Sequence, residues 1–150
     1  MFTGEHVQKM DDKGRVIVPF KFRDELGNKV VITRGLDGCL FAFSEEVFQK
    51  LEEKLAELPF TDKKVRDFNR FFLAGVANLE TDKLGRVLMP SVLRGYASLQ
   101  KEVVWVGVGN RMEIWNIDEW NKQMADFTAE GSDANKKLEE LAEYMAELGI

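Results

Sequence analysis

Residues 11–19 read D-D-K-G-R-V-I-V-P, and residues 82–90 read D-K-L-G-R-V-L-M-P, 71 positions later. The aspartate, glycine, arginine, valine and proline recur at matching positions. Asp-x-x-Gly-Arg is typical of a turn, because the aspartate side chain accepts hydrogen bonds from the backbone ahead of it and glycine adopts positive φ. The aliphatic run after each arginine ends at a proline, which predicts a short strand. The chain is therefore built around one repeated unit, a turn followed by a strand.

The similarity between the two halves continues beyond these stretches. Each proline is followed by a short basic segment, with Lys21 and Arg23 in the first half and Arg94 in the second. Two further strands then follow in each half, separated by a glycine-containing turn. The predicted strands cover residues 29–34, 39–43, 102–108 and 112–115, with turns at 35–38 and 109–110. F-S-E-E-V-F at 43–48 corresponds to W-N-I-D-E-W at 115–120, so aromatic residues match aromatic residues twice.

Helices are predicted where the repeat ends. Ser44 and Asn116 are typical helix N-caps, and Pro59 stops the helix that Ser44 begins. Thr61 is the expected cap of a further helix, which ends at Gly75 and connects the two halves.

The end of the chain differs in charge from the rest. Residues 126–150 contain seven acidic and two basic side chains and carry the whole net charge of −5, so the first 125 residues sum to zero. Phe127–Gly131 is predicted to be a loose linker, followed by a helix from Ser132 to Gly149. That helix has an apolar face consisting of Leu138, Leu141, Met145 and Leu148. The face either docks on the chain's own body or contacts another subunit, and the sequence leaves both open.

Composition excludes several classes of protein. A chain of 150 residues at 45% apolar can bury a core without disulfides. The single cysteine, Cys39, excludes an internal disulfide and multi-cysteine metal sites, and the single histidine, His6, excludes a two-histidine metal motif. We expect Cys39 to be a small buried hydrophobe and His6 to be an ordinary surface or edge residue. No signal peptide or long apolar run is present, which predicts a cytoplasmic location.

No set of residues points to catalysis or to a cofactor. The adjacent carboxylates Asp11 and Asp12 point to opposite sides of an extended chain, so they do not form a hydrolytic pair. The glycine-containing turns lack the G-x-x-x-x-G-K-[ST] sequence of a phosphate-binding loop. We therefore expect neither an enzyme nor a cofactor-binding protein.

The arginines of the repeated turns, Arg15 and Arg86, have three interpretations. Each can stabilise its turn by pairing with the aspartate four residues earlier, although an exposed pair contributes only about 0–1 kcal/mol. Alternatively, a guanidinium group on a turn that leads into a strand suits the bases and phosphates of DNA, with Lys13 and Lys83 adding phosphate-binding charge. A different anionic partner is the third interpretation.

The opening M-F-T-G-E-H, the two repeated stretches and the intervening R-F-F-L-A-G-V-A together resemble the MraZ family of bacterial transcriptional regulators. The resemblance covers residues 1 to about 125, and two D-x-x-x-R motifs closed by proline are highly specific to that family. It implies an α+β fold in which two tandem AbrB-like swapped-hairpin halves form a double-split β-barrel with flanking helices. The implied boundaries are 1–58 for the first repeat, 59–75 for the connecting helix, 76–125 for the second repeat and 126–150 for the acidic linker and C-terminal helix.

The resemblance also implies a function. The chain would be a sequence-specific, repressor-type regulator of the bacterial division and cell-wall gene cluster, associated with the nucleoid. It would bind double-stranded DNA at short direct repeats upstream of its own operon as a homo-oligomeric ring, without membrane contact or a small-molecule substrate. The competing interpretation is an AbrB-like oligomeric module that binds a protein, as antitoxins do, through its acidic C-terminal helix.

By the motif match, the expected DNA-contacting residues are Arg15, Arg86, Lys13 and Lys83. The residues expected to structure the two turns are Asp11, Gly14, Asp82 and Gly85. The turns differ in one respect, because Asp12-Lys13 in the first corresponds to Lys83-Leu84 in the second. We therefore expect unequal contributions to binding, with Arg15 more important than Arg86.

Overall fold

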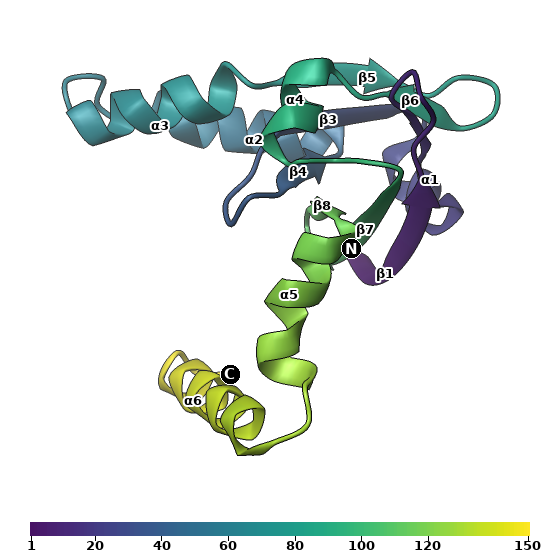
Figure 1. Ribbon diagram of the computed structural model, residues 1–150. Helices are drawn as coiled ribbons and strands as arrows, with labels where there is room; N and C mark the ends of the chain where they lie inside the picture. Colours follow the sequence, from purple (N-terminus) through teal and green to yellow (C-terminus); the bar gives the residue numbers. More distant parts are fainter. The chain divides into compact units, whose positions relative to one another are not determined.

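The elements of the protein fall into two groups along the chain. The computed structural model describes residues 1–150 and divides them into two compact units, Met1–Asn116 and Ile117–Ile150. The elements of the first unit (Figure 1) are β1 (Phe2–Lys9), β2 (Arg15–Ile17), α1 (Phe20–Leu26), β3 (Lys29–Arg34), β4 (Leu40–Phe43), α2 (Glu45–Ala56), α3 (Lys63–Leu73), β5 (Ala77–Glu80), β6 (Arg86–Leu88), α4 (Ser91–Tyr96), β7 (Glu102–Gly109) and β8 (Met112–Asn116). The second unit consists of α5 (Ile117–Thr128) and α6 (Ser132–Glu147). The fold is α+β, as the sequence predicts, and none of its helices has the length and apolar composition needed to cross a bilayer.

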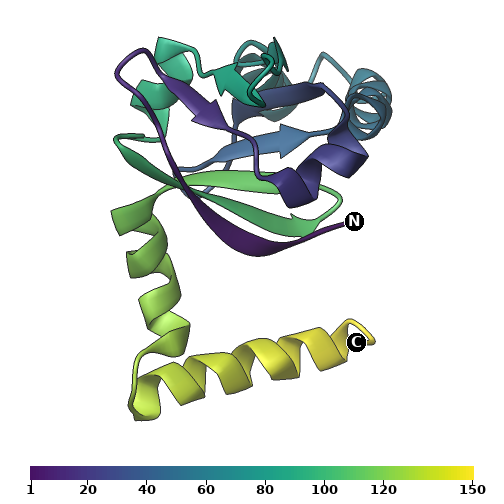
Figure 2. The same cartoon turned by 90° about the vertical axis from the view of Figure 1, so that its right-hand side faces the viewer.

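Strand pairing interleaves the two halves of the repeat. The larger sheet has the order β1-β7-β8-β4-β3-β5, with every neighbouring pair antiparallel. β1, from the first half, runs alongside β7 of the second half (Figure 2), and β5 of the second half pairs with β3 of the first. β2 and β6, one from each half, form a separate two-stranded ribbon. The sequence indicates a strand near His6 without giving the bounds of β1, it does not predict β5, and neither half builds its sheet alone.

The six-stranded sheet carries a buried apolar cluster on each face, because successive side chains of a strand point to opposite sides. Val30 and Ile32 of β3 belong to the larger cluster, together with residues of the ribbon, α1 and α4. Val31 lies on the other face, in a cluster with Phe48 of α2 and Phe72 of α3. The sheet is therefore covered by the ribbon on one side and by the α2–α3 pair on the other.

Two short helices occupy the segments that the sequence shows only as basic. α1 and α4 begin directly after Pro19 and Pro90, which serve as their N-cap residues. Each helix buries one large apolar side chain, Phe22 in α1 and Leu93 in α4. With seven and six residues, these helices are too short to show a helical period in the sequence.

Of the N-cap residues predicted for α2 and α3, the first is confirmed and the second is wrong. Ser44 caps α2 as predicted, and its hydroxyl accepts a hydrogen bond from the backbone N–H of Val47 at 3.2 Å. Thr61 does not cap α3. The cap is the next residue, Asp62, whose carboxylate accepts from the backbone N–H of Lys64 at 2.9 Å.

The second unit consists of two helices joined by a short connection. α5 continues to Thr128, so the first two residues of the predicted linker Phe127–Gly131 are helical. α6 begins at Ser132 as predicted, with Gly131 as its N-cap residue. An ion pair between Lys137 and Asp126, at 3.2 Å, joins α6 to α5.

Candidate functional site

The two repeated turns lie at opposite ends of the β2–β6 ribbon. The strands are antiparallel, and the valine pair at the centre of the ribbon points into the core. Because side chains alternate along a strand, the residues on either side of each valine lie on the outward face. Arg15 is opposite Leu88, and Arg86 is opposite Ile17, so the two arginines occupy diagonal positions on this face. The outward face therefore combines two cationic and two aliphatic side chains.

The first turn is held together by its aspartate. One carboxylate oxygen of Asp11 accepts hydrogen bonds from the backbone N–H groups of Lys13, at 3.0 Å, and Arg15, at 2.8 Å. The other oxygen accepts from Arg15 Nε at 2.6 Å. Gly14 supplies the positive φ of +89° that the turn requires. The structure thus brings the aspartate and the arginine into direct contact.

The second turn repeats this geometry with different residues in the middle. Asp82 accepts from the backbone N–H groups of Leu84 and Arg86, both at 2.9 Å, and from Arg86 Nε at 2.8 Å. Gly85 has φ +78°. The replacement of Lys13 by Leu84 at the equivalent position leaves the hydrogen bonding of the turn unchanged.

Each aspartate uses only one nitrogen of its arginine. Nε is bonded, so the two terminal nitrogens of Arg15 and of Arg86 stay free for a ligand, and these side chains are 34% and 27% exposed. The pKa values of Asp11 and Asp82 lie below the ordinary value, first because the arginine backbone N–H donates to each carboxylate and also because the guanidinium pairs with it. Both carboxylates are therefore charged at neutral pH, and each holds its guanidinium in one orientation.

Each turn is also supported by an arginine from the other half of the chain. Arg23, in α1, donates from Nε to the carbonyl oxygen of Val18 at 2.8 Å and places its guanidinium against Gly85. Arg94, in α4, donates from Nε to the carbonyl oxygen of Met89 at 3.1 Å and lies in the same way against Gly14. The sequence shows Arg23 and Arg94 only as parts of basic segments. Their equal spacing from the two prolines was the available signal that they have equivalent roles.

The surroundings of the ribbon are positively charged although the chain is acidic. The basic side chains of the two turns and of the adjacent short helices include Lys13, Arg15, Arg23, Lys83, Arg86 and Arg94. Over the same turns and helices the acidic side chains are Asp11, Asp12, Asp24, Glu25 and Asp82, so that, with Lys21 included, seven basic side chains stand against five acidic ones. Lys13 and Lys83 are exposed and belong to no ion pair of the protein. Cations therefore exceed acids around the ribbon, which suits an anionic ligand.

Replacement of Gly85 by alanine is expected to destabilise the protein more than the same change at Gly27. Both glycines have positive φ, +78° and +68°, so alanine introduces backbone strain of about 1–3 kcal/mol at either position. A Cβ at Gly85 would overlap the Arg23 guanidinium, whereas a Cβ at Gly27 has no neighbour within 4 Å. Gly85→Ala must therefore also displace Arg23 and break its bond to Val18, a further loss of about 0.5–1.5 kcal/mol. Urea denaturation measures both variants.

A double-mutant cycle provides the control for this prediction. In the Arg23→Ala background, Gly85→Ala is expected to cost no more than Gly27→Ala, because the displaced guanidinium is absent. Equal destabilisation by the two glycine variants in the unmodified protein would show that Arg23 does not support the second turn.

The remaining chemically reactive residues lie apart from the ribbon or inside the protein. Cys39 is fully buried, as predicted, and burial raises the pKa of its thiol far above the ordinary value. His6 lies on the edge strand β1, with its ring edge-on to Phe22 at 5.1 Å and its Nε2 buried without a hydrogen-bond partner. It is an edge residue, as expected, but its ring is packed and not free in solvent. No cluster of three or more His, Cys, Asp or Glu residues is placed to hold a metal ion.

The chain is similar to known proteins over its whole length. The model of one family, described as "MraZ protein, putative antitoxin-like", matches twice, at residues 1–71 and 72–141. A protein named "Transcriptional regulator MraZ" from Acetivibrio thermocellus is 51% identical over 150 residues, covering 100% of both chains. Proteins of the same name from Caldicellulosiruptor saccharolyticus and Halothermothrix orenii are each 49% identical over 150 residues, again covering 100% of both chains.

Proposed function

Because the chain belongs to the MraZ family, we propose that it is a sequence-specific, DNA-binding transcriptional regulator of the repressor type. The three similar proteins are named as transcriptional regulators, and each matches the chain over its full length. The proposed DNA-binding surface is the outward face of the β2–β6 ribbon. The observation that supports this proposal concerns Arg15 and Arg86 on that face. The Nε atom of each guanidinium donates to an aspartate, which orients the group and leaves its two terminal nitrogens available to a ligand.

The geometry of the ribbon suits the major groove of DNA. A two-stranded ribbon fits that groove, and the free fork of an arginine matches the O6 and N7 atoms of guanine. Residues at diagonal positions on a ribbon lie about 7–8 Å apart, close to two base-pair steps of about 3.4 Å. Arg15 and Arg86 therefore reach guanines about two steps apart. Ile17 and Leu88, between the arginines, suit the methyl group of thymine.

The other cations of the surface have supporting roles in this proposal. Lys13 and Lys83 have exposed ammonium groups beside the ribbon, and they contact phosphates without reading bases. Arg23 and Arg94 place their guanidinium groups against the glycines of the turns and add positive charge. Asp11 and Asp82 orient the two reading arginines. No cofactor takes part.

The fold supports an assignment to tandem AbrB-like swapped hairpins in a double-split barrel. Its support is the reciprocal exchange of edge strands, β1 to the second half and β5 to the first, together with a ribbon made from one strand of each half. The division into repeats at 1–58 and 76–125, a connecting helix at 59–75 and an acidic segment at 126–150 stays a prediction.

Binding to DNA requires several copies of the chain in this proposal. One chain presents two arginine turns and a net charge of −5, and so few cations bind nonspecific DNA only weakly, at about 10⁻⁴ M or worse. A homo-oligomeric ring places several ribbons on one face, and each later contact then becomes intramolecular, which raises affinity by about 10²–10⁴. The matching operator consists of short direct repeats upstream of the chain's own operon, in the division and cell-wall gene cluster. Association with the nucleoid follows from this binding.

Footprinting on the DNA upstream of the chain's own gene tests the proposal. We expect protection of several short repeats at constant spacing, and methylation of guanine N7 within a repeat is expected to interfere with binding because the arginines contact that atom. Uniform weak protection, with no guanine interference, would contradict sequence-specific binding.

A second candidate function is a protein-binding, antitoxin-like module that uses the acidic helix α6. The observation that favours it is the exposed apolar face of α6 among acidic side chains. Protein truncated after Gly131 separates the two functions when its affinity for heparin and DNA is measured at two salt concentrations. If the chain is a DNA-binding regulator, each truncated subunit is expected to bind DNA at least as tightly as a full-length subunit. The ribbon is still present, and the acidic charge of the C-terminal segment has been removed. A protein-binding module shows no salt-dependent DNA affinity with or without α6.

A further inference from the structure

The two ends of the β2–β6 ribbon share a backbone geometry but expose different side chains. The antiparallel pairing brings the start of α4 to the first turn, where the backbone N–H of Met89 donates to the carbonyl oxygen of Gly14 at 2.9 Å. It brings the start of α1 to the second turn by an equivalent bond from Val18 to Gly85 at 3.0 Å. We call the first turn with the start of α4 the first end of the ribbon, and the second turn with the start of α1 the second end. The exposed residues at equivalent positions are Lys13 and Ser91 at the first end, and Leu84 and Phe20 at the second end.

Phe20 and Leu84 are exposed and belong to one surface. Their exposed fractions are 75% and 65%. The Arg23 guanidinium lies against Gly85 in the second turn. Its Cζ is also 5.9 Å from the ring centroid of Phe20, so one side chain contacts both the turn and the first residue of α1. Apolar side chains that gather on an exposed surface mark a site of interaction.

Neither apolar side chain is needed to form its turn or its helix. The backbone N–H of Leu84 donates to Asp82 at 2.9 Å, and the backbone N–H of Lys13 makes the equivalent bond at 3.0 Å, so the turn forms with either side chain. In the same way, α4 begins with Ser91 where α1 begins with Phe20. The first end therefore shows that this backbone forms without an exposed leucine or phenylalanine, which leaves contact with a ligand as their role.

The second residue of each short helix points away from this surface. Lys21 turns to β1, where its Nζ donates to the carbonyl oxygen of Thr3 at 3.2 Å. Val92 is the equivalent residue of α4, so the same geometry directs its exposed side chain away from the first turn. The exposure of Val92 therefore does not make the first end equivalent to the second.

We propose that Phe20 and Leu84 contact the methyl groups of thymine in the DNA that Arg86 reads. The inference rests on the proposed function, because it concerns the same face of the ribbon. Arg86 and Lys83 lie in the second turn with Leu84, and Arg23 adds a third cation over the Phe20 ring. The ligand of this end therefore combines an apolar group with negative charge. Thymine in DNA has this combination, because its methyl group lies on the major-groove edge between two phosphate backbones, and phenylalanine is among the side chains that contact it.

The difference between the two ends fixes the direction of the chain on its DNA repeat. A ribbon with two identical ends binds a site equally well in either direction, because a half-turn exchanges the ends. Here the second end requires a thymine methyl beside the guanine that Arg86 contacts. Lys13 and Ser91 at the first end suit phosphates and the polar edges of bases instead. Each chain is therefore expected to bind its repeat in one direction only.

Substitution of deoxyuridine for thymine tests the proposal in the full-length protein, because it removes only the methyl group. The probe is the footprinted DNA upstream of the chain's own gene, substituted at one thymine position of every repeat at a time. Loss of one methyl contact is expected to lower affinity about fourfold for each repeat that is engaged. The variant Phe20→Ser/Leu84→Lys gives the second end the residues of the first. In this variant we expect the loss to disappear at thymines beside the guanine that Arg86 contacts, and to remain at thymines that face Ile17 and Leu88.

The readout is the ratio of each protein's affinities for the thymine and deoxyuridine forms of the DNA, so a general gain in affinity from the added lysine cancels. Phe60→Ser/Leu36→Lys is the matched control, because these side chains are 80% and 53% exposed and lie outside the ribbon, its turns and the short helices. It is expected to keep the full sensitivity to deoxyuridine.

Three outcomes would overturn the proposal. The first is sensitivity to deoxyuridine that is unchanged at every thymine in Phe20→Ser/Leu84→Lys. The second is binding of the unmodified protein that shows guanine N7 interference but no sensitivity to deoxyuridine, and both of these outcomes leave the proposed function untouched. The third is absence of any sequence-specific binding, which would overturn the proposed function as well.

Discussion

Arg15→Ala is expected to abolish or severely weaken binding to operator DNA while leaving the melting temperature and the oligomer nearly unchanged. A bidentate arginine–guanine contact contributes about 1–3 kcal/mol to discrimination, so each lost contact lowers affinity about 5- to 150-fold. The loss multiplies when several subunits engage one operator. The fold is expected to tolerate the change because Arg15 projects from the outward face of the ribbon and its ion pair with Asp11 is exposed. Gel shifts and thermal denaturation measure the two effects.

Matched variants separate base reading from general charge. Arg86→Ala is expected to weaken binding less than Arg15→Ala. Lys13→Ala and Lys83→Ala are expected to weaken binding to all sequences alike, and each is expected to reduce the salt dependence by about one unit of slope. Arg70→Ala serves as the control, because Arg70 is an exposed arginine on α3 with an aspartate partner at 3.3 Å, away from the ribbon. Unfolding of Arg15→Ala, with DNA affinity retained in the folded fraction, would favour a purely structural role for the arginine.

Affinity is expected to rise steeply with the number of repeats in the DNA. If the ring engages several repeats at once, DNA with four repeats is expected to bind about 10²–10⁴ times more tightly than DNA with one. A gel-shift series with one, two, three and four repeats measures this gain. Insertion of half a helical turn, about five base pairs, between repeats is expected to remove most of it, because the next repeat then faces away from the ring. Equal affinity for one repeat and for four would leave a single-subunit reader as the better account.

The repeated turns could be predicted from the sequence because their determinants are local. Asp11 and Arg15 are four residues apart, and every hydrogen bond between them is made within one turn. The same holds for Asp82 and Arg86, so the repeat in the sequence becomes a repeat in structure. The α+β class was implied by the resemblance to the MraZ family, and the separate strands and helices were predicted from local patterns. The short helices α1 and α4 were not predicted, because each buries only one large apolar side chain and a helical period of apolar residues needs several.

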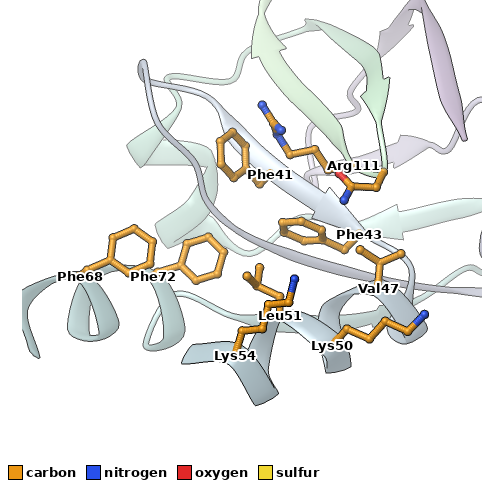
Figure 3. Close-up of a pocket in the computed structure, with 10 residues that line it drawn as sticks. Phe41, Phe43, Val47, Lys50, Leu51, Lys54, Phe68, Phe72 and Arg111 are labelled. Carbon is orange, nitrogen blue, oxygen red and sulfur yellow. The ribbon is translucent and has the colours of Figure 1, made fainter. Parts of the chain in front are cut away.

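Only the tertiary structure decided which distant segments meet. The pairing of β1 with β7 joins Phe2 to Gly109, and no local pattern specifies a partner so far along the chain. The support of Gly85 by Arg23 arises in the same way, because the antiparallel ribbon brings α1 of one half to the turn of the other. The pocket lined by Phe43, Phe72 and Arg111 (Figure 3) depends on helices, a strand and a strand turn that are separate in sequence. These features follow from the packing of buried faces against each other, which is a property of the whole chain, whereas the turns follow from hydrogen bonds between near neighbours.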